Sequence, residues 1–93
     1  MKFTKKAFTQ WLNGKRSGEK VGNPESIHNC PLCNFLMSQG AKSVSMGFSG
    51  RTVDGKRYGN PIWAAAFQSA VCKHVDYDET KYITAKTAFT YLG

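Results

Sequence analysis

Three cysteines and two histidines are the side chains of this 93-residue chain best suited to metal or redox chemistry. They form a His28-x-Cys30-x-x-Cys33 run and a later Cys72-x-His74 pair. Zinc is held tetrahedrally by four thiolate or imidazole ligands, and a CxxC segment supplies two of them from one turn of the chain. If zinc is bound, the set that the spacing favours is His28, Cys30, Cys33 and Cys72.

The helix expected over residues 61–75 weakens this zinc hypothesis. Residues two apart on an α-helix differ by about 200° around its axis, so Cys72 and His74 cannot both face one ion. Free cysteines are commonly small buried residues, and we favour that simpler interpretation for all three thiols. We therefore expect no cofactor, and keep a small zinc-stabilised domain as the second alternative.

The Cys30-Pro31-Leu32-Cys33 segment also has the spacing of a redox dithiol, because a thiol at a helix N-terminus has a lowered pKa. Such a motif requires a preceding strand of a thioredoxin-like sheet, and residues 24–29 do not have a strand pattern. The sequence also lacks a nucleophile arranged with a histidine, a pair of catalytic carboxylates and a phosphate-binding glycine motif. We therefore expect that the protein is not an enzyme.

Positive charge is the strongest compositional signal, with a formal net charge of +7. It is concentrated in an N-terminal segment and in a later turn-rich segment, whereas the C-terminal segment is near neutral. Such asymmetry favours an acidic or polyanionic partner. The candidate partner-binding residues are Lys5, Lys6, Lys15, Arg16 and Lys20 in the first cluster and Arg51, Lys56, Arg57 and Tyr58 in the second.

Two kinds of partner fit these clusters. An acidic protein surface is the first hypothesis, because arginine and tyrosine are frequent anchors of protein interfaces; an inhibitor protein would belong to this class. Nucleic acid is the alternative, since lysines and arginines on one face would bind phosphates. The chain has no helix-turn-helix, zinc-finger, RNP or KH signature. We accordingly predict a small basic binding module, monomeric or weakly dimeric.

Two helices and an intervening loop are predicted in the first part of the chain. Thr4 is a suitable N-cap, and Gly14 a suitable stop, for a helix over about residues 4–13. Residues 14–29 have little periodicity and are expected to form a long loop. Pro31 suits the first turn of a second helix over about residues 30–39.

A small antiparallel hairpin or three-strand meander is predicted over about residues 43–58. Residues 43–48 alternate polar and apolar types, which is typical of a half-buried strand, and Val44, Met46 and Phe48 would point inward. Ser49-Gly50 and Asp54-Gly55 supply the turns.

Two further helices are predicted near the C-terminus. Asn60-Pro61 has the pattern of an N-cap followed by a first-turn proline, which starts a helix over about residues 61–75. A last helix is expected over about residues 84–92. Their inward stripes would be Trp63, Ala66, Phe67, Ala70, Val71 and His74 in the first and Ala85, Ala88, Phe89 and Leu92 in the second.

These elements predict a single α+β domain over residues 1–93, with about four short helices packed on one face of the hairpin or meander. No apolar run approaches the roughly 20 residues that span a bilayer, and the basic N-terminus is not followed by an apolar signal segment. We therefore expect a cytoplasmic protein that does not bind membranes.

Several segments resemble a group of small uncharacterised bacterial and phage proteins. The resemblance spans most of the chain, from Phe3 to Leu92, and implies no particular activity. A small single-domain protein of this kind would also suit a phage-encoded inhibitor of a host complex. The similar segments are Cys30-Pro31-Leu32 followed by Asn34-Phe35-Leu36, Pro61-x-Trp63-Ala64 with Phe67, and Ile83-Thr84-Ala85 with Ala88 and Leu92.

Overall fold

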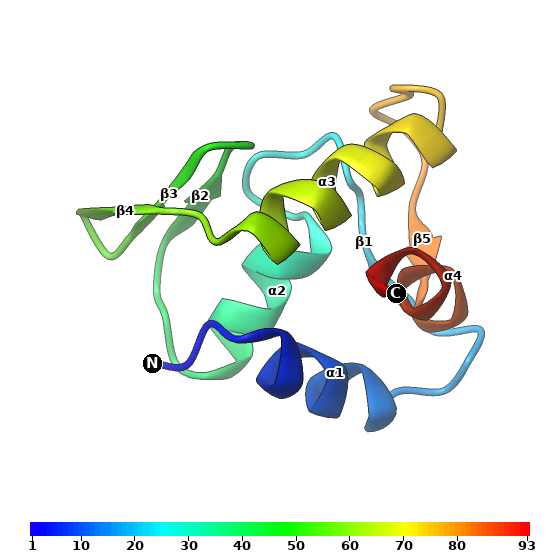
Figure 1. Ribbon diagram of the computed structural model, residues 1–93, viewed down its shortest axis with the longest axis horizontal. Helices are drawn as coiled ribbons and strands as arrows, with labels where there is room; N and C mark the ends of the chain where they lie inside the picture. Colours follow the sequence, from blue (N-terminus) through cyan, green and yellow to red (C-terminus); the bar gives the residue numbers. More distant parts are fainter.

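The computed structural model describes residues 1–93 and contains four helices and two small antiparallel sheets (Figure 1). The predicted α+β class, with a three-strand meander, is confirmed. The meander has the strand order β2-β3-β4, and the second sheet pairs β1 with β5. The elements are α1 Lys5–Asn13, β1 Lys20–Gly22, α2 Pro31–Ser38, β2 Val44–Met46, β3 Gly50–Val53, β4 Lys56–Gly59, α3 Ile62–His74, β5 Ile83–Thr84 and α4 Ala85–Leu92.

Side chains cap three of the four helices at their N-termini. Thr4, Cys30 and Thr84 each accept a hydrogen bond from the backbone N–H three residues later, at the starts of α1, α2 and α4. These bonds satisfy N–H groups that have no partner within the helix. Asn60 does not cap α3 as predicted, because its side chain donates to the Gly47 carbonyl at 2.8 Å; Pro61 occupies the N-cap position without a side-chain bond.

A cluster of aromatic rings joins α1, α2 and α3 into the main core. Phe8 is completely buried at its centre. Its ring centroid lies 5.3 Å from that of Phe35 and 5.1 Å from that of Phe67. Trp11 and Trp63 each lie 5.8 Å away. Edge-to-face and tilted pairs at these separations add to the energy of area burial, so this cluster holds the three helices together.

The predicted loop over residues 14–29 contains a strand that the sequence did not indicate. Lys20 pairs with Thr84 and Gly22 with Ile83, which joins the segment after α1 to the start of α4. Strands of two and three residues are too short to give an alternating pattern. The backbone at Gly22 packs closely against the backbone at Asn29, because a Cβ at position 22 would lie 2.7 Å from the Asn29 carbonyl oxygen.

The buried stripe of α3 is rotated relative to the predicted one. Ala66 and His74 are exposed. The reason is that the chain segment at Pro24 covers the side of α3 that carries Gln68. The Gln68 Nε2 donates to the Pro24 carbonyl at 2.6 Å. The buried residues of this helix are Ala64, Phe67, Gln68, Val71 and Cys72.

Two aromatic residues that were predicted to point inward are exposed. Phe48 is 52% exposed, because β2 ends at Met46 and the chain turns away from the core. Phe89 of α4 is 36% exposed, since the small residues Ala85 and Ala88 form the buried side of that helix. The meander and α4 consequently present more apolar surface than the sequence pattern predicts.

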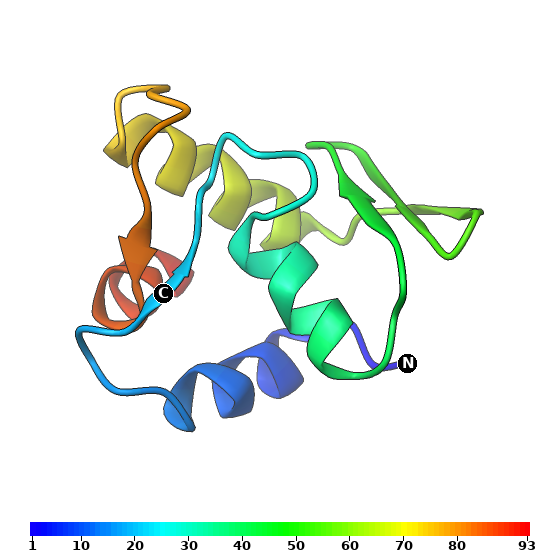
Figure 2. The same cartoon turned by 180° about the vertical axis from the view of Figure 1, so that it is seen from behind.

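The helices do not cover one face of the meander as expected. They pack mainly on one another, and the meander adjoins them chiefly where β2 meets α2. Figures 1 and 2 show the meander projecting from one end of the molecule. No helix is long and apolar enough to cross a membrane; the longest, α3, has 13 residues.

Candidate binding site

The pleat of the meander divides its charged residues between two faces. Arg51 on β3 lies opposite Tyr58 on β4, and Val53 lies opposite Lys56. Because successive side chains of a strand point to opposite faces, these four share one face. Arg57 pairs with Thr52 and lies on the other face. The cluster predicted from the sequence is therefore two sites rather than one.

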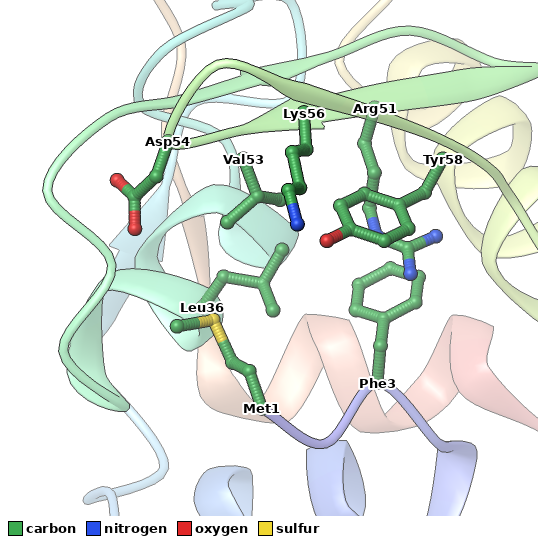
Figure 3. Close-up of a pocket in the computed structure, with 8 residues that line it drawn as sticks. All are labelled: Met1, Phe3, Leu36, Arg51, Val53, Asp54, Lys56 and Tyr58. Atoms are coloured by element: carbon green, nitrogen blue, oxygen red, sulfur yellow. The ribbon is translucent and has the colours of Figure 1, made fainter.

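The first face forms one wall of a cavity of about 300 Å³, here called the meander pocket. Figure 3 shows the ammonium group of Lys56 and the hydroxyl of Tyr58 pointing into it, whereas the carboxylate of Asp54 points away. That carboxylate accepts hydrogen bonds from the backbone N–H groups of Lys42 and Ser43 at 2.8 and 2.9 Å. The pocket is lined by Met1, Phe3, Leu36, Arg51, Val53, Asp54, Lys56 and Tyr58.

Arg51 is held between two aromatic rings at the side of this pocket. Its guanidinium carbon lies 4.0 Å from the ring centroid of Phe3 and 5.1 Å from that of Tyr58. Its Nη1 donates to the Gly59 carbonyl at 2.8 Å and to the side-chain oxygen of Asn60 at 3.2 Å. Partial burial lowers the pKa of Arg51, but an arginine so far above neutrality stays protonated at pH 7. The pocket thus keeps a fixed positive charge beside an apolar floor.

The opposite face carries Arg57 beside a smaller hollow. This hollow, of about 220 Å³, lies between the sheet and the exposed side chain of Ile27. Ser45 and Thr52 are the other sheet side chains on this face. It is more polar than the meander pocket, so Arg57 stands on a solvated surface.

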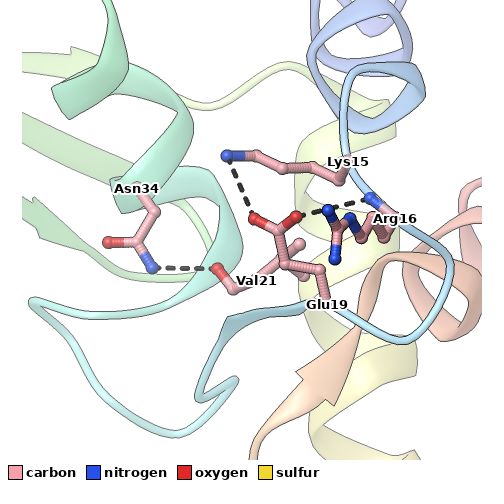
Figure 4. A network of polar contacts seen from close by, with 5 residues as sticks. All are labelled: Lys15, Arg16, Glu19, Val21 and Asn34. Carbon is pink, nitrogen blue, oxygen red and sulfur yellow. Dashed lines mark hydrogen bonds and ion pairs between the residues drawn. The ribbon is translucent and has the colours of Figure 1, made fainter.

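The N-terminal cluster lies elsewhere and is partly neutralised. Figure 4 shows Glu19 between Lys15 and Arg16. Its carboxylate lies 3.6 Å from Lys15 Nζ and accepts a hydrogen bond from the backbone N–H of Arg16 at 3.3 Å. The Lys15 ammonium also lies 4.8 Å from the ring centroid of Trp11. One of the positive charges of this loop, that of Lys15, is therefore paired within the loop.

The remaining N-terminal lysines are dispersed over the helical side of the molecule. Lys5 donates to the Gly93 carbonyl at 3.1 Å, and Lys6 is exposed on α1. The Lys20 ammonium lies 5.8 Å from the ring centroid of Tyr82. Figures 1 and 2 place the loop after α1 and the meander at opposite ends of the molecule, so Lys15 and Arg16 do not share a surface with the meander cluster.

The structure brings Cys30 and Cys33 together at the start of α2. Their sulfur atoms are 3.1 Å apart, with Cys30 donating to Cys33, which in turn donates to the Ile27 carbonyl at 3.3 Å. The hydrogen bond to Cys33, together with burial, raises the pKa of Cys30, while the same bond lowers the pKa of Cys33. Both side chains are completely buried, which keeps them from reacting with large partners.

The other two members of the favoured zinc set lie apart from this pair. His28 Nδ1 is 3.0 Å from the Val44 carbonyl oxygen, and Cys72 Sγ donates to the Pro24 carbonyl at 3.4 Å. Burial, with a smaller contribution from the nearby charge of Glu25, raises the pKa of Cys72 to about 11. In this structure no three histidine, cysteine or acidic side chains come together as a group that could hold a metal ion.

Five residues that line the meander pocket were not among the predicted binding residues: Met1, Phe3, Leu36, Val53 and Asp54. Phe3 and Leu36 come from the segment before α1 and from α2, so the pocket joins the meander to parts of the chain that are distant in the sequence. The alternation of residues 51–53 was a usable signal, since it places Arg51 on the same face as Val53. The contribution of Phe3 depends on contacts distant in the sequence.

No protein-family model, curated protein or solved structure matches this chain.

Proposed function

We propose that the protein is a non-enzymatic binding module that docks an acidic segment of a partner protein at the meander. The observation that carries this proposal is the meander pocket, where Arg51 and Lys56 stand beside an apolar floor. An acidic protein segment offers both carboxylates for the cations and apolar side chains for the floor. Binding sites commonly combine such an apolar lining with a few placed polar groups.

Two features favour a protein segment over nucleic acid. A polynucleotide needs a continuous row of cations along its backbone, and the loop after α1, with Lys15 and Arg16, lies at the other end of the molecule from the meander. Tyr58 could stack a base, but one of its neighbours is already the Arg51 guanidinium, 5.1 Å from the ring centroid. The stacked arginine instead gives a rigid, charged edge to the pocket.

The expected affinity is modest. Lys56 and Arg57 are exposed, and an exposed ion pair contributes only about 0.2–1 kcal/mol. These charges would mainly accelerate association and select an acidic surface, while burial of apolar groups in the pocket supplies most of the binding energy. Binding should consequently weaken with salt without being abolished by it.

The test is affinity capture from the native host with the full chain, with and without nuclease. We expect the wild type to retain a stoichiometric acidic protein after nuclease treatment. The double substitution Lys56→Glu with Arg57→Glu should lower the amount retained at least about tenfold, because like charges now face the partner. Circular dichroism and urea unfolding check that the variant is folded.

A charge-matched control is Lys81→Glu with Lys86→Glu, on exposed residues near β5 and α4. This variant has the same net charge as the first and should retain the partner as the wild type does. Equal loss in both variants would show that only total charge matters. Undiminished capture by the meander variant, or recovery of nucleic acid that nuclease removes, would overturn the proposal.

A further inference from the structure

The outer edge of β4 is unpaired. This strand has one neighbour, β3, and all four of its residues are exposed. A two-residue turn at Asp54-Gly55 joins β3 and β4, so Val53 and Lys56 form a hydrogen-bonded pair. Hydrogen-bonded and non-hydrogen-bonded pairs alternate along the two strands, which makes Thr52–Arg57 a non-hydrogen-bonded pair. The backbone N–H and C=O of Arg57 consequently point away from β3, toward the open edge.

We propose that the partner's acidic segment binds in an extended form and adds to this edge as a fourth, antiparallel strand. This inference rests on the proposed function and specifies how the partner is held. One residue of the added strand would exchange both backbone hydrogen bonds with Arg57. Strand addition of this kind takes affinity from the main chain and specificity from alternate side chains.

Charge decides what can occupy the edge. A second copy of the chain pairing antiparallel about Arg57 would place that residue opposite its own counterpart, and like charges directly opposite one another are destabilising. Lysine and arginine on an exposed edge are also a common protection against self-association. An acidic strand reverses the sign of these contacts, so the same residues that reject another copy favour an acidic partner.

The register of the meander predicts the order of side chains in the partner. The residue opposite Arg57 shares its face, away from the meander pocket, and should be acidic. The preceding residue lies opposite Tyr58 on the pocket side and should be apolar or aromatic. The following residue lies opposite Lys56 and should be acidic. The recognised segment is therefore apolar–acidic–acidic in an extended conformation.

The test uses a panel of fluorescent 12-residue peptides, rich in threonine and valine, that carry this triplet at their centre. Phenylalanine, leucine or valine takes the first position, and aspartate or glutamate the other two. Fluorescence anisotropy with the wild-type protein should give saturable binding. The reversed triplet should bind at least about tenfold more weakly, because it places a carboxylate beside Tyr58 and an apolar side chain opposite Lys56.

Methylation of single peptide nitrogens tests the hydrogen bonds without altering the protein. An N-methyl group on the peptide residue opposite Arg57 removes the N–H that would donate to the Arg57 carbonyl. This change should weaken binding at least about tenfold. Methylation of the next residue serves as the control, because its N–H points away from β4 and its loss should leave the affinity within about twofold.

Two outcomes would overturn strand addition: no triplet peptide binding at up to 1 mM, or equal affinity for the two methylated forms. Either result is distinct from failure of the proposed function, which is decided by the capture experiment with the charge variants. In a further arm, Arg57→Glu should bind the peptide better when lysine replaces the residue opposite position 57. Unchanged preference in that arm would contradict the predicted register.

Discussion

The helical part of the molecule and the meander use their side chains in opposite ways. Around Phe8, large aromatic residues from three helices are buried against one another. In β4, by contrast, no residue is buried, and its three side chains are cationic or phenolic. Folding energy is therefore concentrated at one end and chemical groups for recognition at the other. Substitutions should accordingly separate stability from binding.

The largest expected effect follows from Phe8→Ala. Phe8 is completely buried among four aromatic rings, so its removal leaves a cavity as well as lost apolar contacts. The free energy of unfolding should fall by about 3–5 kcal/mol, measured by urea denaturation. Ile62→Ala, at a side chain that is 89% exposed, is the control and should change it by less than about 0.5 kcal/mol. Similar losses in the two variants would contradict a single aromatic core.

A somewhat smaller loss, about 3 kcal/mol, is expected for Gly22→Ala. The added Cβ would lie 2.7 Å from the Asn29 carbonyl oxygen and from the Pro31 nitrogen, and backbone atoms cannot move aside cheaply. Gly18→Ala has open space around its Cβ and should be nearly neutral. Thermal unfolding of the two alanine variants measures the difference. A neutral Gly22→Ala would show that the joint between β1 and α2 is not tightly packed.

The smallest stability effect concerns pH and belongs to the helical side alone. Cys72 has a pKa of about 11 in the folded protein, above its ordinary value near 9. Between these values the unfolded chain loses the thiol proton and the folded chain keeps it, so stability is lost as pH rises. The loss should be on the order of 2 kcal/mol by pH 11.

Comparison with Cys72→Ala isolates this titration from those of lysines and tyrosines. Unfolding free energies of both proteins are measured from pH 8 to pH 11, and the wild type should show the steeper decline. Parallel curves would mean that Cys72 ionises as easily in the folded state as in the unfolded one. The meander variant Lys56→Glu with Arg57→Glu keeps this thiol and should retain the wild-type slope.

Local signals predicted most of the elements correctly. Thr4, Pro31 and the Asp54-Gly55 turn each act within a few residues, and the corresponding helix starts and hairpin are present. The turn has positive φ angles of 49° and 86° at its two residues, as its sequence suggests. Short-range chemistry of this kind needs no knowledge of the rest of the fold.

The candidate site was harder to predict because it depends on contacts between distant segments. Charge clustering along the sequence placed Arg57 with Arg51, whereas the pleat separates them. It also linked the meander to Lys15 and Arg16, which the fold moves to the other end of the molecule. The ring of Phe3 beneath the Arg51 guanidinium could not be inferred from either segment alone.

The absence of buried residues in β4 affects how the protein can evolve. Proteins are selected to remain above a stability threshold, and most substitutions in a core bring them closer to it. Substitutions at Lys56, Arg57 and Tyr58 remove no buried side chain, so they change the recognition surface while leaving most of this stability reserve intact. A lineage could therefore track a changing partner, or acquire a new one, through single substitutions in this strand.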